Sequence, residues 1–108
     1  MDEPWMKPGE YVLLESRAWV WVKVIAGPSL TKAKIYLTNH RLYGKDALFR
    51  IKLFNFPFHT IKKIKRKKKY LHIEAEIKGR RQALDIRIKD IDESWEWMIW
   101  ERIKMLKR

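Results

Sequence analysis

The 108-residue chain contains no cysteine. Disulfide bonds and metal sites built from thiolates are therefore excluded, and the composition fits a reducing compartment. Glycine is also scarce, with four in the chain, and each stands alone in the sequence. A glycine-rich loop of the kind that cradles phosphate groups is therefore absent.

Long apolar stretches are missing as well. The longest uninterrupted run is Ala18 to Val22, five residues, whereas a membrane-spanning helix needs about 20. The acidic start, Met1 to Pro4, lacks the basic and then apolar pattern of a secretory signal. We therefore expect a chain that neither crosses a membrane nor carries such a signal.

Catalytic groups do not occur in any recognisable arrangement. Nucleophilic catalysis requires a nucleophile, a base and an orienting group brought together, and no motif surrounds Ser16, Ser29 or Ser94. Histidines occur in three separate segments and without metal-ligand spacing, at His40, His59 and His72. We expect no enzymatic activity, no cofactor and no metal site.

Basic residues are what the chain has in excess, with a formal net charge of +12. Residues 62–81 carry ten basic and two acidic side chains. Their balance of +8 is two-thirds of the net charge. Within them, seven of the eight residues from Lys62 to Lys69 are cationic. Charge concentrated in this way attracts anionic surfaces.

Alternating patterns predict β-strands along most of the chain. In a first strand over 11–25, Arg17, Trp19, Trp21 and Lys23 oppose small and branched residues, and we expect this odd set to face outward. The reverse, with both tryptophans in the core, stays open. Six further strands are predicted over 31–38, 41–43, 47–56, 60–65, 70–77 and 83–88.

Turn residues separate these strands. Three turns are predicted, at Gly27-Pro28-Ser29, at Gly44-Lys45-Asp46 and at Lys78-Gly79-Arg80-Arg81. In the second strand, Tyr36 shares the outward parity of Lys32 and Lys34. Pro57, which lacks a backbone donor, should end the fourth strand.

The tail changes period from two to 3.6 residues, which predicts a helix over about 91–107. Its apolar stripe consists of Trp95, Met98, Ile99, Ile103 and Leu106. Trp100 lies at the edge of the stripe, and Trp97 points away from it and should be exposed.

Leu37, Thr38, Arg41 and Leu42 resemble the "LT-x-x-RL" signature of pleckstrin-homology-like (PH-like) domains, especially the GRAM and prokaryotic PH groups. Gly9-Glu10 followed by an apolar run, and the segment Phe56 to Ile64, also resemble these groups. The resemblance implies a mainly β fold with a C-terminal helix. Seven strands would form a partly open barrel of two roughly orthogonal antiparallel sheets, capped by that amphipathic helix. We expect one domain over 1–108, with the barrel at about 9–90 and the helix at about 91–107.

For function, we expect a non-enzymatic adaptor that attaches to an anionic membrane surface or to phosphate-bearing lipid headgroups. It would act on the cytoplasmic side, at the inner membrane face. The residues expected to bind the anion are Lys32, Lys34, Lys62, Lys63, Lys65, Arg66, Lys67, Lys68, Lys69, Arg80 and Arg81. The alternative for the basic run is a solvated edge strand whose lysines block aggregation.

Exposed tryptophans support a second hypothesis, a protein-interaction or homo-oligomerisation module. The residues for that interface are Trp19, Trp21, Trp97 and Trp100. Nucleic-acid binding is a third hypothesis, because aromatic and basic residues are interleaved. Non-specific binding to polyanions is expected of any domain with this charge.

Overall fold

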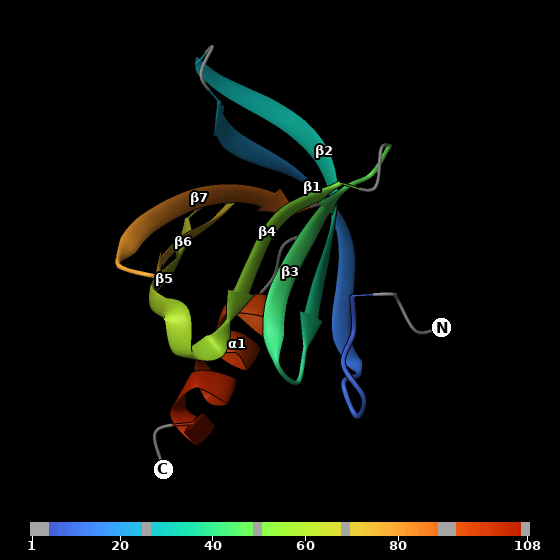
Figure 1. The fold of residues 1–108 in the computed structure, drawn as a ribbon, viewed down its shortest axis with the longest axis vertical. Coiled ribbons are helices and arrows are strands. Elements are labelled where there is room, and N and C mark those ends of the chain that lie inside the picture. The colour runs from blue at the N-terminus through green and yellow to red at the C-terminus, as the bar shows by residue number, and fades with distance from the viewer. Residues whose placement is uncertain (1–4, 25–26, 49–50, 68–69, 89–92, 107–108) are drawn as a thin grey trace.

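The computed structural model describes residues 5–24, 27–48, 51–67, 70–88 and 93–106. Seven antiparallel strands are followed by one helix (Figure 1). The strands are β1 (Val12–Val24), β2 (Gly27–Thr38), β3 (Arg41–Asp46), β4 (Lys52–Pro57), β5 (Ile61–Lys67), β6 (Tyr70–Ile77) and β7 (Arg80–Ile88). A single 3-10 turn, Phe58–Thr60, joins β4 to β5, and the helix α1 spans Glu93–Leu106.

All seven strands belong to one sheet, in the order β4-β3-β2-β1-β7-β6-β5. The long strand β1 lies at its centre, pairing with β2 along its length and with β7 from Ala18 to Trp21. Within the described residues β4 and β5 end the sheet, so it is not closed into a barrel. The predicted fold class, mainly β with seven antiparallel strands and a C-terminal helix, is confirmed. The strands form one open sheet, where two roughly orthogonal sheets of a partly open barrel were expected.

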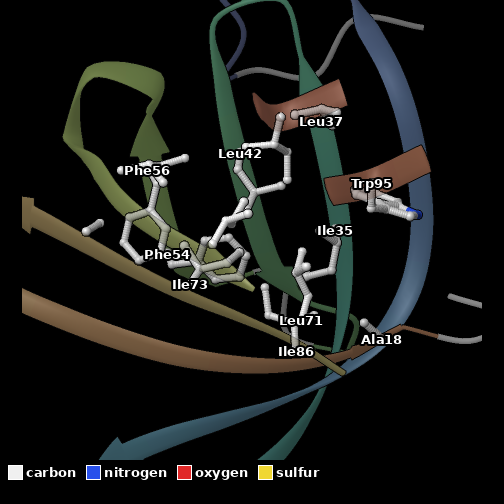
Figure 2. Close-up of a cluster of buried hydrophobic side chains, with 14 of the residues drawn as sticks. Ala18, Ile35, Leu37, Leu42, Phe54, Phe56, Leu71, Ile73, Ile86 and Trp95 are labelled. Atoms are coloured by element: carbon white, nitrogen blue, oxygen red, sulfur yellow. The ribbon is translucent and has the colours of Figure 1, made fainter. Parts of the chain in front are cut away.

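The core lies between the concave face of the sheet and α1 (Figure 2). Alternation places Val20, Ile35 and Ile73 on this face with no exposed surface. From the helix, Trp95 and Ile99 pack against them. Each such side chain gains about 1.5–3 kcal/mol when it leaves water, so the apolar stripe is what holds the helix on the sheet.

The orientation expected for β1 is confirmed. Trp19 and Trp21 are 39% and 48% exposed, whereas Ala18 and Val20 are buried. The predicted helix is confirmed as α1. Trp97 is exposed, as expected, at 63%. Trp100 is partly buried at the edge of the core. The side chain of Leu106 lies outside the described ones.

Two of the predicted turns are wrong. Gly27-Pro28-Ser29 begins β2, with Gly27 opposite Val24, because proline is tolerated at the start of a strand. Gly44-Lys45-Asp46 belongs to β3. A β-carbon on Gly44 would overlap the ring of Phe54, so this glycine lets the ring lie against the strand and does not mark a turn.

The boundaries of two other predictions change. The turn after β6 consists of Lys78 and Gly79, with φ angles of 53° and 79°, a pattern typical of tight two-residue hairpins. Arg80 and Arg81 therefore lie in β7. The fourth strand begins at Lys52 and not at residue 47. It ends at Pro57, as predicted.

Tyr36 is the one residue predicted to face outward from β2 that is buried, at 2% exposure. It does lie on the outer face of the sheet, but residues from the N-terminus cover it. The ring of Trp5 lies 5.5 Å from that of Tyr36 and stacks on Tyr43 at 4.0 Å. Parity alone could not reveal this cover.

Candidate anion-binding site

The signature residues Thr38 and Arg41 form a buried cluster with Glu10. The Thr38 hydroxyl donates to Glu10 Oε2 at 2.6 Å. Arg41 donates to both carboxylate oxygens of Glu10, from Nε and Nη2, each at 3.0 Å. All three residues are buried, and this two-point geometry is the strong form of an arginine–carboxylate pair.

This cluster also fastens residues 5–11, the N-terminal segment, to the β2–β3 corner. The backbone N–H of Lys7 donates to Glu10 Oε1 at 3.0 Å. Asn39 donates from Nδ2 to the Gly9 carbonyl at 3.2 Å and accepts the backbone N–H of Tyr11 at 2.9 Å. Gly9 adopts a φ of 81°, which glycine reaches without a steric cost.

Electrostatics favour the ionised form of Glu10. Burial by itself would raise its pKa. The hydrogen bonds from Lys7 and Thr38, together with the positive charge of Arg41, outweigh that effect and hold the pKa below its ordinary value. The signature residues therefore act as a structural lock, with their polar groups turned toward one another and not toward a ligand.

The basic run lies mainly on β5, at one end of the sheet. Five of its cations are described and all are exposed: Lys62, Lys63, Lys65, Arg66 and Lys67. Lys63 lies 4.0 Å from Glu74, and Arg66 lies 3.9 Å from Glu96. Within the described part of the chain Lys62, Lys65 and Lys67 have no ion pair, although Lys67 lies over the ring of Tyr70. Lys68 and Lys69 lie outside the described residues.

The other predicted cations lie on other strands of the sheet. Lys32 and Lys34 lie on β2, and β1, β7 and β6 separate that strand from β5. Four strand spacings amount to roughly 19 Å along the sheet. Arg80 and Arg81 lie near the turn between β6 and β7, whereas Lys67 is opposite Tyr70 at the far end of β6. Arg81 lies 3.7 Å from Glu74, which Lys63 of β5 also approaches at 4.0 Å. Lys32 and Lys34 are thus apart from the β5 cations, whereas Arg81 shares a carboxylate with one of them.

A small polar cluster covers the outer face of β6 and β7. His72 Nδ1 lies 2.7 Å from Asp85 Oδ1, and its Nε2 lies 3.1 Å from Glu74 Oε2. The bond with His72 lowers the pKa of Glu74; desolvation opposes it in part, and the nearby charges of Lys63 and Arg81 lower it further. Among the described residues no group of acidic and histidine side chains has the arrangement of a metal site.

Two features escaped the sequence reasoning. Glu10 and Arg41 were each part of a recognised motif, but nothing in a linear pattern shows that they pair across 31 positions. The second is Arg87, a cation beside the exposed tryptophans of β1. Parity marks Arg87 as outward-facing, but only the strand order reveals that β7 lies next to β1.

No protein-family model and no curated protein sequence matches this chain. Among solved structures, the fold is similar to the C-terminal domain of an unknown protein from Leishmania infantum, with a TM-score of 0.67. The two sequences are 16% identical, and the alignment covers 89% of this chain and 87% of that one. The likeness shows a shared fold. In the described part of the chain, no helix has the length and apolar character needed to span a membrane.

Proposed function

We propose that the chain is a non-enzymatic, PH-like binding module of the GRAM or prokaryotic PH type. It attaches to anionic membrane surfaces, or to phosphate-bearing lipid headgroups, at the inner face of the membrane. The strand order, with β1 shared by both halves of an open sheet and a helix at the C-terminus, supports the PH-like part of this proposal.

The observation that carries the binding part is the exposed edge strand β5. Lys62, Lys65 and Lys67 stand there without an ion pair among the described residues. A lysine near an acidic lipid surface gains about 1 kcal/mol, so a few of them give reversible attachment. Charge attraction of this kind has little stereospecificity.

Vesicle sedimentation tests the proposal. The wild-type chain should pellet with vesicles containing acidic lipid and not with neutral ones. The double variant Lys65→Gln/Lys67→Gln should bind acidic vesicles about thirtyfold more weakly, from about 2 kcal/mol of lost attraction. The matched control is Lys52→Gln/Lys104→Gln, which removes the same charge from exposed positions on β4 and α1. Equal losses in both variants would reject β5 as the attachment site.

A protein-interaction module is the second candidate, supported by the 63% exposure of Trp97 on α1. Exposed large aromatics are typical of interfaces. Light scattering of the wild type and of Trp97→Ala at increasing concentration tests self-association. A monomer at every concentration rejects homo-oligomerisation through this residue.

A further inference from the structure

The outer face of the sheet carries two exposed tryptophans set among cations. Trp19 of β1 stands directly between Lys32 of β2 and Arg87 of β7. Opposite residues of antiparallel strands point to the same face. Lys32 Nζ lies 5.3 Å from the centroid of the Trp19 ring, within the range of a cation–π contact.

One neighbouring row contains the second tryptophan, and the other contains further cations. Two residues along β1, Trp21 lies between Leu30 and Asp85. Two residues the other way, Arg17 is opposite Lys34, which in turn is opposite Lys45 of β3. We call the six exposed residues of this area the Trp19–Trp21 face; they are Arg17, Trp19, Trp21, Leu30, Lys32 and Arg87.

The charge of this face is positive because its cations outnumber the two carboxylates beside it. Glu15 lies 3.4 Å from Lys34, and Asp85 bonds His72. Arg17, Lys32 and Arg87 have no ion pair within the described residues. Three cations without an ion pair in the described part of the chain therefore lie around the partly exposed ring of Trp19, and the ring of Trp21 lies in the next row.

We propose that the Trp19–Trp21 face binds single-stranded nucleic acid. Bases stack on Trp19 and Trp21, and the phosphates lie against Arg17, Lys32 and Arg87. Aromatic side chains that alternate with cations on an open sheet surface are the combination that single strands use, because every base has a π face and every nucleotide has a charge. This site is on other strands than β5 and does not depend on membrane attachment.

A bilayer fits this face less well. Asp85 lies opposite Trp21. If Trp21 entered a bilayer, the Asp85 carboxylate would come close to the acidic headgroups and be repelled. Neither tryptophan is more than half exposed, so the rings offer surfaces for stacking more than apolar projections for insertion. A second copy of the chain fits less well too, because two such faces repel each other.

The test compares two probes of equal length and charge that differ only in their bases. One is a deoxythymidine oligomer of about 12 nucleotides, within the range of site sizes of small β domains. The other is the same oligomer without bases. The wild-type chain should bind the first at least fivefold more tightly at physiological salt, because charge alone treats both alike.

The double variant Trp19→Leu/Trp21→Leu should lose this preference and keep its affinity for the abasic probe. Each stacked base lost corresponds to a roughly 5- to 150-fold change. Trp97→Leu, at an exposed tryptophan on α1, is the matched control and should keep the preference. Trp19→Phe/Trp21→Phe should retain part of it, since a smaller ring still stacks. If the leucine variant does not fold, two other measurements test the proposal. They are the affinity of the phenylalanine variant and photo-crosslinking of a thiolated thymidine probe to residues 17–23.

The cations are tested separately. Lys32→Gln/Arg87→Gln should reduce the slope of log affinity against log salt by about 1.4, at about 0.7 per phosphate contact. Lys65→Gln/Lys67→Gln should leave the preference for bases unchanged, even where it abolishes vesicle binding. Equal affinity of the wild type for both probes overturns the proposal. So does crosslinking only outside residues 17–23, or a leucine variant that loses acidic vesicles and keeps the oligomer, which would make the face a bilayer contact.

Discussion

The outer face of the sheet has two halves, one covered and one exposed, although tryptophan lies on both. Over β2 and β3 the N-terminal segment lies on the sheet, and Trp5 stacks on Tyr43 at 4.0 Å, with Arg41 5.6 Å from its ring. Over β7, β1 and β2, Trp19 and Trp21 remain partly exposed. The N-terminal segment stays on the first half because the bidentate pair between Glu10 and Arg41 holds it there.

The comparison shows that a tryptophan on the outer face of the sheet has no fixed role. Where a short segment can be locked by a buried ion pair, the aromatic becomes part of the structure. Where the neighbours are Lys32 and Arg87 and no segment of the described residues lies above, it remains available to a partner. Variants that remove the lock should therefore act on stability, and variants of the bare half should act on binding.

Removal of the Glu10 carboxylate should have the largest effect. Glu10→Ala leaves the guanidinium of Arg41 buried without its partner, which typically costs about 3–5 kcal/mol. Urea unfolding of the two proteins measures it. Glu10→Leu/Arg41→Met, which removes both charges, should be less destabilised than Glu10→Ala. A double variant as unstable as the single one would show that packing, and not the unpaired charge, dominates.

The tryptophans themselves give the next largest contrast. Trp5→Ala removes the stack on Tyr43 and uncovers Tyr36, and we expect a loss of about 2–3 kcal/mol, less than for a fully buried tryptophan. Trp21→Ala should stay within about 0.5 kcal/mol of the wild type, as do most surface changes. Denaturant midpoints of both variants check this. Equal losses would mean that the two halves are not different in the way proposed.

Acid should loosen the covered half. The pKa of Glu10 is lowered in the folded protein, so the unfolded chain binds a proton more readily than the folded one. The stabilisation is fully present above the ordinary value of 4.5 and is lost as pH falls through the folded-state pKa. The unfolding midpoints at neutral pH and near pH 3 should therefore differ less for Glu10→Gln than for the wild type. Glu74, whose pKa is also lowered, adds a dependence of the same sign that the variant retains.

The fold was largely predictable because period and composition act locally. Alternation identified seven strands and the inward set of β1, and the change of period identified α1. Gly44 was misread because a glycine marks a turn in most sequences, and its role here depends on the ring of Phe54 from the next strand. Tyr36 was misread for a similar reason, since its cover comes from Trp5, distant in sequence.

The candidate site was less predictable. The exposure of the basic run and of Trp19 followed from parity, but the grouping of charges depends on strand order. Lys32 was assigned to the same anion site as Lys65, yet three strands lie between β2 and β5. Arg87 was not singled out, because nothing in residues 83–88 indicates that they lie beside β1. Which cations act together is a property of the sheet and not of any segment.

The smallest expected effect on stability is that of changing Glu15. This residue is a glutamate like Glu10 and lies only five positions away, so the two can be compared directly. Glu15 lies on the bare half at 3.4 Å from Lys34, and both side chains are well exposed. Surface pairs of this kind contribute about 0–1 kcal/mol, so Glu15→Gln should leave the unfolding midpoint almost unchanged.

The same substitution also releases Lys34 from its counter-charge. Binding of the thymidine oligomer should therefore become slightly tighter, with a salt slope steeper by up to about 0.7. A clear loss of stability, or weaker binding, would place Glu15 among the structural groups and move the boundary between the two halves past Lys34.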